Sequence, residues 1–153
     1  MTTTTTTRRL GDGNKYGAKR TWSASCERWF DSKAEAARAD ELVLLERAGK
    51  IRELEFQPSW VLCERPRVTY TADFIYRDPS RMVNFADGPR LTQEPLVVVE
   101  DVKGVLTRDV RTKLAWLRET HGVTVTLLRQ TRGGFAEVAW LGRERKTKQR
   151  RKP

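Results

Sequence analysis

The chain has few of the residues that most often carry nucleophilic or zinc chemistry. It contains two cysteines, Cys26 and Cys63, and one histidine, His121, among 153 residues. This set does not form a zinc site at any usual spacing, and it makes a Cys-His nucleophile a poor candidate. Both cysteines are expected to be unpaired and at least partly buried. If the protein is an enzyme, carboxylates, lysine and a metal ion must carry its chemistry.

Long hydrophobic runs are also absent. No apolar segment approaches the roughly 20 residues that a membrane-spanning helix needs, and the threonine run of residues 2–7 followed by Arg8-Arg9 contains no secretory signal. We therefore expect a cytoplasmic protein with no membrane partner. A chain of 153 residues with 38% hydrophobic content can bury one core, which predicts a single domain.

Negative charge is the scarcer sign, because 30 Lys and Arg residues face 20 Asp and Glu residues. The net charge of +10 favours a polyanionic partner, of which nucleic acid is the commonest. Residues 1–14 are expected to be a disordered tail, and residues 143–153 form a basic tail suited to phosphate contacts. The basic tail lacks the apolar face of a membrane-binding helix. The folded domain is expected to span residues 15–142.

Hydrophobic patterning predicts two helices and several strands. One helix is expected over residues 33–48, with Asp31 or Ser32 as its N-cap and Gly49 as its end, and a second over 109–121. Residues 78–94 hold several Pro and Gly positions and predict a loop. Strands are expected over residues 28–30, 51–56, 60–62, 68–76, 96–103, 123–128 and 135–141. This order of helices and strands indicates an α/β fold with a mixed sheet flanked by helices.

The segment 96–103 is the most apolar of these strands, which predicts a central position in the sheet. Because side chains alternate along a strand, Asp101 and Lys103 should share one face, and Glu100 should face the other way. An Asp-x-Lys pair of this kind is often only a surface ion pair. At the end of an apolar strand, however, it is a candidate catalytic pair.

Two further acids extend this candidate site. If the strand that carries Asp73 lies beside the strand of residues 96–103, Asp73 can reach Asp101, and two such carboxylates repel unless a cation separates them. Carboxylate ligands suit Mg²⁺ or Mn²⁺. Glu35, on the first helix, could supply a third carboxylate, although it also fits a capping box with Ser32.

In this order, Glu35, Asp73 and Asp101-Val102-Lys103 resemble the signature of the PD-(D/E)XK nuclease superfamily. With their flanking residues they are similar to a phage-encoded branch related to archaeal-type Holliday junction resolvases. The resemblance implies a restriction-endonuclease-like core, Mg²⁺ or Mn²⁺ held by Asp73, Asp101 and Glu35, and Lys103 as a catalytic residue. It also implies a homodimer that cuts four-way DNA junctions. Ala72 stands where the signature has proline.

Several other residues are candidates for DNA contact. Gln57 could hydrogen-bond near the scissile phosphate or stabilise a turn, and Trp22, beside the basic arm, is the best candidate for base stacking. The other tryptophans are expected in the core or in a dimer contact. The basic candidates for phosphate contact, each of which could also be a solvated charge, are Lys15, Lys19, Arg20, Arg108, Arg111 and Lys113.

Two other functions stay open. The protein could be a nicking or restriction-like endonuclease on ordinary duplex DNA, which would cut linear substrates. It could also be a non-catalytic DNA-binding protein on a nuclease fold, which would bind DNA and leave it uncut. Magnesium-dependent cleavage would separate the enzymes from the binding protein.

Overall fold

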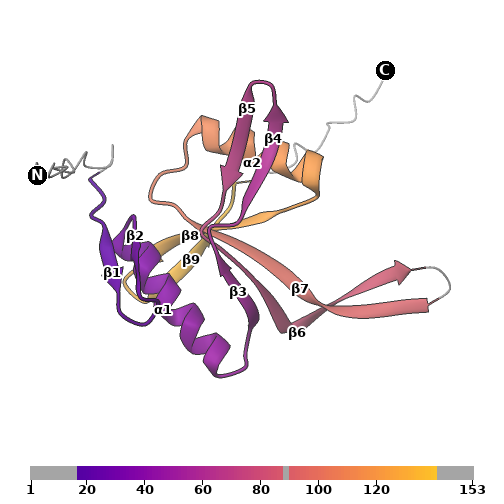
Figure 1. Ribbon diagram of the computed structural model, residues 1–153, viewed down its shortest axis with the longest axis horizontal. Coiled ribbons are helices and arrows are strands. Elements are labelled where there is room, and N and C mark those ends of the chain that lie inside the picture. Colours follow the sequence, from indigo (N-terminus) through magenta and orange to yellow (C-terminus); the bar gives the residue numbers. More distant parts are fainter. Residues whose placement is uncertain (1–16, 88–89, 141–153) are drawn as a thin grey trace, which may run out of the picture.

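The structure is a computed structural model that describes residues 17–87 and 90–140. In this part of the chain, a five-stranded mixed sheet and two two-stranded sheets are combined with two helices (Figure 1). The predicted α/β class is therefore confirmed. The elements in chain order are β1 (Thr21–Ser23), β2 (Arg28–Phe30), α1 (Lys33–Arg47), β3 (Arg52–Phe56), β4 (Ser59–Glu64), β5 (Arg67–Thr71), β6 (Phe74–Asp87), β7 (Arg90–Val102), α2 (Arg108–His121), β8 (Val125–Thr131) and β9 (Gly134–Val138).

The main sheet has the strand order β3-β6-β7-β8-β9, so β7 is its central strand, as its valine run predicts. Strands β7 and β8 are parallel and are connected through α2, while the other neighbouring pairs are antiparallel. This crossover places the end of β7 and the start of α2 on one side of the molecule, where α1 also begins (Figure 1). Side chains at the end of β7 therefore lie between the starts of the two helices.

Each face of the main sheet is covered by a different set of elements. On one face, α1 packs through Ala36, Ala39 and Leu42 against strand residues that include Phe74 and Val102. The small alanine side chains allow the helix to lie close to the sheet. On the other face, Leu114 and Leu117 of α2 pack with residues of β4, β5, β7 and β8. The two cores share no residue, so neighbouring residues of β7 contribute to different cores.

The ends of both helices follow their sequence signals. The Ser32 hydroxyl accepts a hydrogen bond from the backbone N–H of Glu35 at the start of α1, and Thr107 caps α2 in the same way. Gly122 ends α2 in the left-handed conformation, with φ of 66°. Both predicted helices are confirmed, with ends that differ by one residue from the expected ones. The two cysteines are unpaired and half-buried, also as expected.

The predicted loop over residues 78–94 is wrong, because residues 78–87 and 90–94 extend β6 and β7 as a long antiparallel pair, which we call the β6–β7 hairpin. The hairpin projects beyond the body of the sheet (Figure 1), where neither β3 nor β8 pairs with it. A two-stranded ribbon buries little surface, so its sequence needs no apolar run. Pro79 lies within the register shift between Asp78 and Met82, an irregularity that tolerates proline in a strand.

The predicted strand over residues 68–76 is also corrected, because the chain changes sheets within it. Strand β5 pairs with β4 in a small sheet, and β6 begins in the main sheet after Ala72 and Asp73. The matching change from β3 to β4 occurs at Gln57, whose φ is 56°. Strand β1 is an additional strand, and the last strand, predicted over residues 135–141, ends at Val138.

Some predictions concern residues outside the described ranges. The disordered tail of residues 1–14 and the basic tail of residues 143–153 lie outside the described residues. Lys15 also lies outside them. Neither α1 nor α2, the helices of the described residues, has the length and apolarity that a transmembrane helix requires.

Candidate functional site

The alternation along β7 separates its two acidic residues onto opposite faces of the sheet. Asp101 is fully buried at 0% exposure and faces the α2 side, where it contacts Tyr70. Glu100 is buried at 3% exposure and faces the α1 side, where it contacts Arg38. The predicted separation of Glu100 from Asp101 and Lys103 is therefore confirmed.

Asp101 is held by two neighbouring side chains. Its Oδ2 accepts a hydrogen bond from the hydroxyl of Tyr70 on β5. Its Oδ1 lies 3.0 Å from the Lys103 ammonium nitrogen, which is an ion-pair distance. Within the described part of the chain, this oxygen makes no hydrogen bond. The Lys103 ammonium is therefore the charge partner of this oxygen, which could also contact a bound cation.

Asp73 lies where the chain crosses from β5 to β6, next to the end of β7. Its backbone N–H donates to the Glu100 carbonyl at 3.1 Å, and its Oδ2 accepts from the Val102 backbone N–H at 2.7 Å. Its carbonyl accepts from the Gln57 backbone N–H at 2.9 Å, which joins the two sheet-crossing points. Backbone hydrogen bonds therefore fix Asp73 beside Asp101, as the predicted strand pairing requires.

The electrostatics show that these carboxylates are crowded. Burial, and then the negative charges of Asp101 and Glu35, raise the pKa of Asp73 to about 9. For Lys103, burial opposes the charged form, but the Asp101 carboxylate outweighs it and the pKa is raised. At neutral pH, Lys103 is thus charged, and Asp73 holds its proton when no cation is bound. We call Asp73, Asp101 and Lys103 the carboxylate cluster.

Glu35 sits at the edge of this cluster and completes the predicted capping box. Its carboxylate accepts hydrogen bonds from the Ser32 hydroxyl at 3.0 Å and the Asp31 backbone N–H at 3.3 Å. Burial raises the pKa of Glu35, and Ser32 opposes that shift. Because Glu35 also raises the pKa of Asp73, it acts on the cluster while it caps the helix. The capping-box interpretation of Glu35 is confirmed, and its role as a third metal-binding carboxylate stays a prediction.

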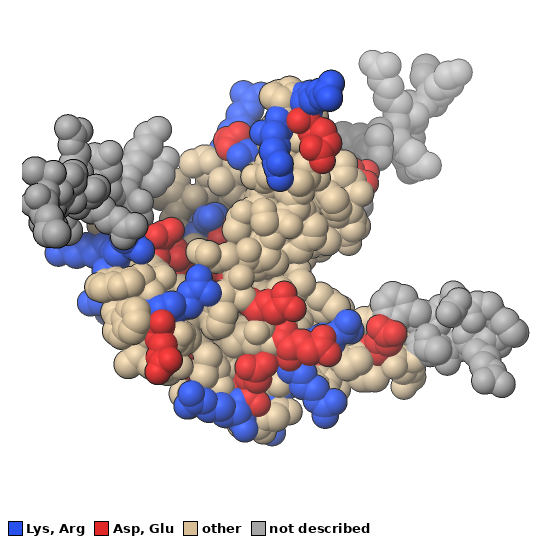
Figure 2. Space-filling view, in the orientation of Figure 1, with Lys and Arg blue, Asp and Glu red and all other residues tan. Residues whose placement is uncertain are grey.

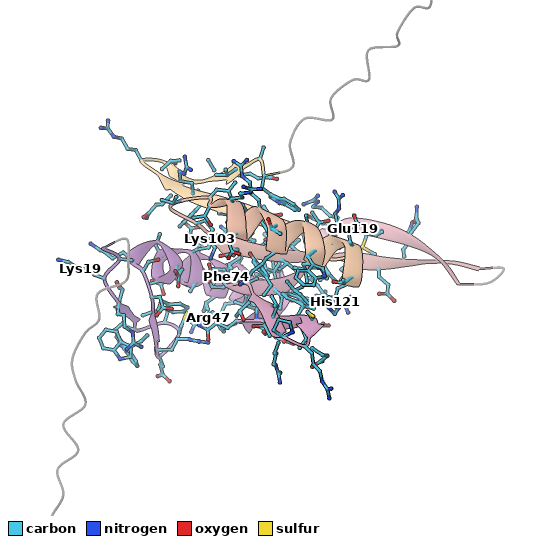
Figure 3. The ribbon with its side chains drawn as sticks, turned by 90° about the horizontal axis from the view of Figure 1, so that it is seen from above. Lys19, Arg47, Phe74, Lys103, Glu119 and His121 are labelled. Carbon is cyan, nitrogen blue, oxygen red and sulfur yellow. The ribbon has the colours of Figure 1, made fainter. Side chains whose placement is uncertain are left out.

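A surface cavity of about 630 Å³ opens beside the cluster. It lies between the starts of the two helices and is lined by Glu35, Lys103 and both N-cap residues, Ser32 and Thr107. Viewed from above, Lys103 lies at the end of the molecule where α2 begins, and His121 lies at the far end of that helix (Figure 3). The partial positive charge of a helix start and the Lys103 ammonium favour an anionic group in this cavity.

The donor set fits a hard divalent cation such as Mg²⁺ or Mn²⁺. Asp101 offers an oxygen without a hydrogen bond, and a bound cation would favour the ionised form of Asp73 beside it. Among residues 17–87 and 90–140, no three Asp, Glu, His or Cys side chains are grouped closely enough to hold a metal by themselves. The two aspartates would therefore hold the ion together with water or a phosphate oxygen, with Glu35 at the edge.

Glu100 belongs to a separate buried network on the α1 face. Arg38 donates to its carboxylate from two nitrogens, each at 2.8 Å, and the Tyr76 hydroxyl donates to it at 2.6 Å. Arg38 also lies over the Phe135 ring, with its guanidinium carbon 5.7 Å from the centroid. This network ties α1 to β6, β7 and β9 directly behind the cluster, so it supports the site without contributing to it.

The other predicted contact residues lie around the cluster or away from it. The Gln57 side chain accepts from Arg28 at 3.2 Å, which with its backbone bond to Asp73 favours the turn interpretation. Lys19 and Arg20 are exposed beside β1. Arg108 and Arg111 are exposed in the first turns of α2, and the half-buried Lys113 lies 3.8 Å from Asp109. Arg108 and Arg111 face solvent at the start of α2 together with Asp109, and Figure 2 shows both signs of charge on the face in view.

Sequence reasoning missed two residues of this region. Tyr70, which binds Asp101, was only one aromatic residue of an expected strand, and its spacing to Asp73 gave no sign that the two lie in different sheets. Arg38, inside a helix, resembled any solvent-facing basic residue. The sequence did contain one indication of such a residue, because Glu100 lies on the most apolar strand and a buried acid needs a cationic partner.

The fold and the site together define a small α/β protein with a buried carboxylate-lysine cluster at the end of its central strand. A family model described as "Protein of unknown function (DUF1064)" matches residues 13–132, well over half of the chain, and the protein belongs to this family. No curated protein and no solved structure matches the chain at a significant level. The functional argument therefore depends on the site itself.

Proposed function

We propose that the protein is a metal-dependent endonuclease that hydrolyses phosphodiester bonds in DNA. The observation that carries the proposal is Asp101, a fully buried carboxylate with one oxygen that lacks a hydrogen bond, placed against Lys103 and beside Asp73. A buried charge cluster of this kind costs folding free energy, so it is expected where chemistry requires it. The net charge of +10 favours a polyanionic substrate.

The residues have separate roles in this proposal. Asp73 and Asp101 would hold Mg²⁺ or Mn²⁺, which supplies Lewis-acid polarisation of the phosphate and activation of water. Lys103 lines the cavity and would stabilise the charge that develops on the phosphate oxygens. Glu35 lines the same cavity and would hold a metal-bound water there. Tyr70 orients Asp101 through its hydroxyl.

The finer proposal is a four-way junction resolvase on a restriction-endonuclease-like core. It is supported by the resemblance of Glu35, Asp73 and Asp101-Val102-Lys103 to the PD-(D/E)XK signature, and by the mixed sheet whose central strand carries Asp101. A homodimer with two such sites would match the symmetry of paired nicks across a junction. The same resemblance suggests a phage origin and action in the cytoplasm of the host cell.

A gel cleavage assay tests the proposal directly. Labelled four-way junction and linear duplex of matched sequence are incubated with the protein in Mg²⁺, in Mn²⁺ or in EDTA. Asp101→Asn removes the charge of the buried acid while it preserves the shape of the side chain. Asp109→Asn is the matched control, because it makes the same change at an exposed residue. Thermal melts of both variants check that they fold.

Each outcome selects one function. Metal-dependent, symmetric nicks in the junction alone, lost in Asp101→Asn and kept in Asp109→Asn, would support the resolvase. Equal cutting of the linear duplex would identify a nicking or restriction-like endonuclease. Tight binding with no cutting in either metal would leave a DNA-binding protein without catalysis and overturn the proposal.

A further inference from the structure

Two tryptophans are exposed side by side on the β1–β2 hairpin, the segment from β1 to β2. Trp22 and Trp29 are direct cross-strand partners, with ring centroids 5.6 Å apart at an interplanar angle of 63°. Their exposed fractions are 49% and 53%, whereas Trp140 is buried in the core. Adjacent aromatic rings left in water are typical of a contact surface, because they gain free energy when a partner covers them.

Basic side chains flank this tryptophan pair. The Arg20 guanidinium carbon lies 5.8 Å from the Trp29 ring centroid, and Lys19 is exposed next to it in the chain. Figure 2 shows basic side chains together with acidic ones at this end of the molecule. Aromatic faces next to cations match the two parts of a nucleotide, its base and its phosphate.

The hairpin is fixed on the body of the protein. The Ser23 hydroxyl donates to Asp40 of α1 at 2.5 Å, and the Ser25 hydroxyl donates to the same carboxylate oxygen. The Ser23 oxygen also accepts from the Cys26 backbone N–H at 3.1 Å, which closes the turn. Phe30, beside Trp29, is buried in the α1 core. The tryptophan pair is therefore presented by a rigid support, which reduces the entropy cost of binding.

The hairpin also leads directly to the cavity beside the carboxylate cluster. Ala18, four residues before Trp22, lines that cavity together with Lys103 and Glu35. Arg20 lies 3.9 Å from Asp31, which precedes the cavity-lining Ser32. Residues 18–20 therefore connect the cavity to the tryptophan pair along the chain.

We propose that Trp22 and Trp29, with Lys19 and Arg20, form a stacking site for unpaired bases of single-stranded DNA that extends from the active-site cavity. The inference rests on the proposed nuclease function and deepens it, because it assigns to the substrate an unpaired segment next to the bond that is cut. Base pairs hide their faces in the stack, so exposed rings favour unpaired bases over duplex. The positive charges of Lys19 and Arg20 favour DNA over an apolar protein surface as the partner that covers the tryptophans.

A binding assay in EDTA tests the site without requiring cleavage. Fluorescence anisotropy measures the affinity of the full chain for three labelled probes of equal length: an oligothymidine strand, an abasic strand with the same phosphates, and a duplex. The abasic strand separates base stacking from charge. Trp22→Ala and Trp29→Ala are compared with Trp22→Phe and Trp29→Phe, and Trp116→Ala on α2 serves as the control, since Trp116 is also exposed.

The expected result is a preference for oligothymidine over the abasic strand, weakened about tenfold by each alanine substitution. The phenylalanine variants should retain part of the preference, and Trp116→Ala should retain all of it. Equal affinity for the oligothymidine and abasic strands would overturn the inference. Unchanged binding by the double alanine variant would also overturn it, and loss of a dimer in that variant would assign the pair to a contact between two copies of the chain. None of these results depends on cleavage, so a failure of the proposed nuclease function is detected separately.

Discussion

The hydroxyl of Tyr70 donates a hydrogen bond to the carboxylate of Asp101, and this bond joins the small β4–β5 sheet to the central strand of the main sheet. Both side chains are buried, Tyr70 at 5% exposure and Asp101 at 0%. Burial, and then the Asp101 charge, raise the pKa of Tyr70 far above its ordinary range, so the hydroxyl keeps its proton at neutral pH. Tyr70 is therefore a permanent donor that orients one oxygen of Asp101.

Tyr70→Phe is expected to lower both stability and activity. It removes the donor to a buried carboxylate, which costs about 1–3 kcal/mol of folding free energy. With Asp101 less well oriented, the single-turnover cleavage rate should fall roughly tenfold, the change that about 1.4 kcal/mol in activation free energy produces. Tyr76→Phe is the matched control, because it removes a hydroxyl from Glu100 on the opposite face. Equal loss of cleavage in both variants would show that the effect is only one of stability.

Asp73→Asn is expected to stabilise the metal-free protein while it abolishes cleavage. The folded-state pKa of Asp73, about 9, lies above the ordinary value of 3.8. The folded protein thus binds this proton more tightly than the unfolded chain does. The resulting stability is fully present below the ordinary value and is lost as the pH rises through the folded value. The asparagine keeps the acceptor for Val102 and is neutral at every pH, so this variant folds without taking up a proton beside Asp101.

Thermal melts in EDTA at pH 5 and pH 8 measure this effect. Each kcal/mol gained should raise the melting temperature by about 2–4 °C, and the gain should be larger at pH 8. Added Mg²⁺ should raise the melting temperature of the unaltered protein and have little effect on Asp73→Asn. A variant that melts lower than the unaltered protein at pH 8 would contradict the role of repulsion in the cluster.

Sequence periodicity was sufficient to predict the part of the site that lies on β7. Strand alternation assigns Asp101 and Lys103 to one face and Glu100 to the other, because a period of two holds wherever a strand is regular. The central position of β7 follows from its valines, since only a strand covered on both faces can bury an uninterrupted apolar run. The helix limits followed from Ser32, Gly49 and Gly122 for similarly local reasons.

The remaining features depend on contacts between distant parts of the chain. The break at Ala72 and Asp73 divides a segment that is uniformly β-forming, so only the pairing of β5 with β4 and of β6 with β7 reveals it. The β6–β7 hairpin has the Pro and Gly content that is typical of a loop. This composition is tolerated because the outer part of the hairpin is not paired with a third strand and so needs no apolar run. The partner of Asp101 was unpredictable from sequence for the same reason, since Tyr70 is 31 residues away.

The buried pair of Arg38 and Glu100 is expected to support the fold and not the chemistry. Arg38→Met leaves Glu100 as an uncompensated buried charge, which should cost about 3–5 kcal/mol. In the double variant Arg38→Met, Glu100→Met, no charge remains buried, so most of this stability should return. The measurements are urea unfolding and cleavage by the double variant at a temperature where it is folded. Loss of cleavage in a folded double variant would place the pair in the catalytic machinery.

Lys103 is expected to serve two separable roles, one in stability and one in cleavage. Without a bound cation, its ammonium is the positive charge beside Asp101 Oδ1, so Lys103→Met should lower the melting temperature in EDTA. Added Mg²⁺ should restore part of that stability by supplying charge to the same carboxylates. The cleavage rate should nevertheless stay reduced by about a hundredfold, because the cation does not replace the donor to the phosphate oxygens.

The affinity of the Lys103→Met variant for the junction should change little, since one phosphate contact among many is lost. Lys50→Met, which removes an exposed lysine just after α1, provides the control. A Lys103→Met variant that cuts the junction at the original rate would remove Lys103 from the mechanism and leave it a counter-ion to Asp101.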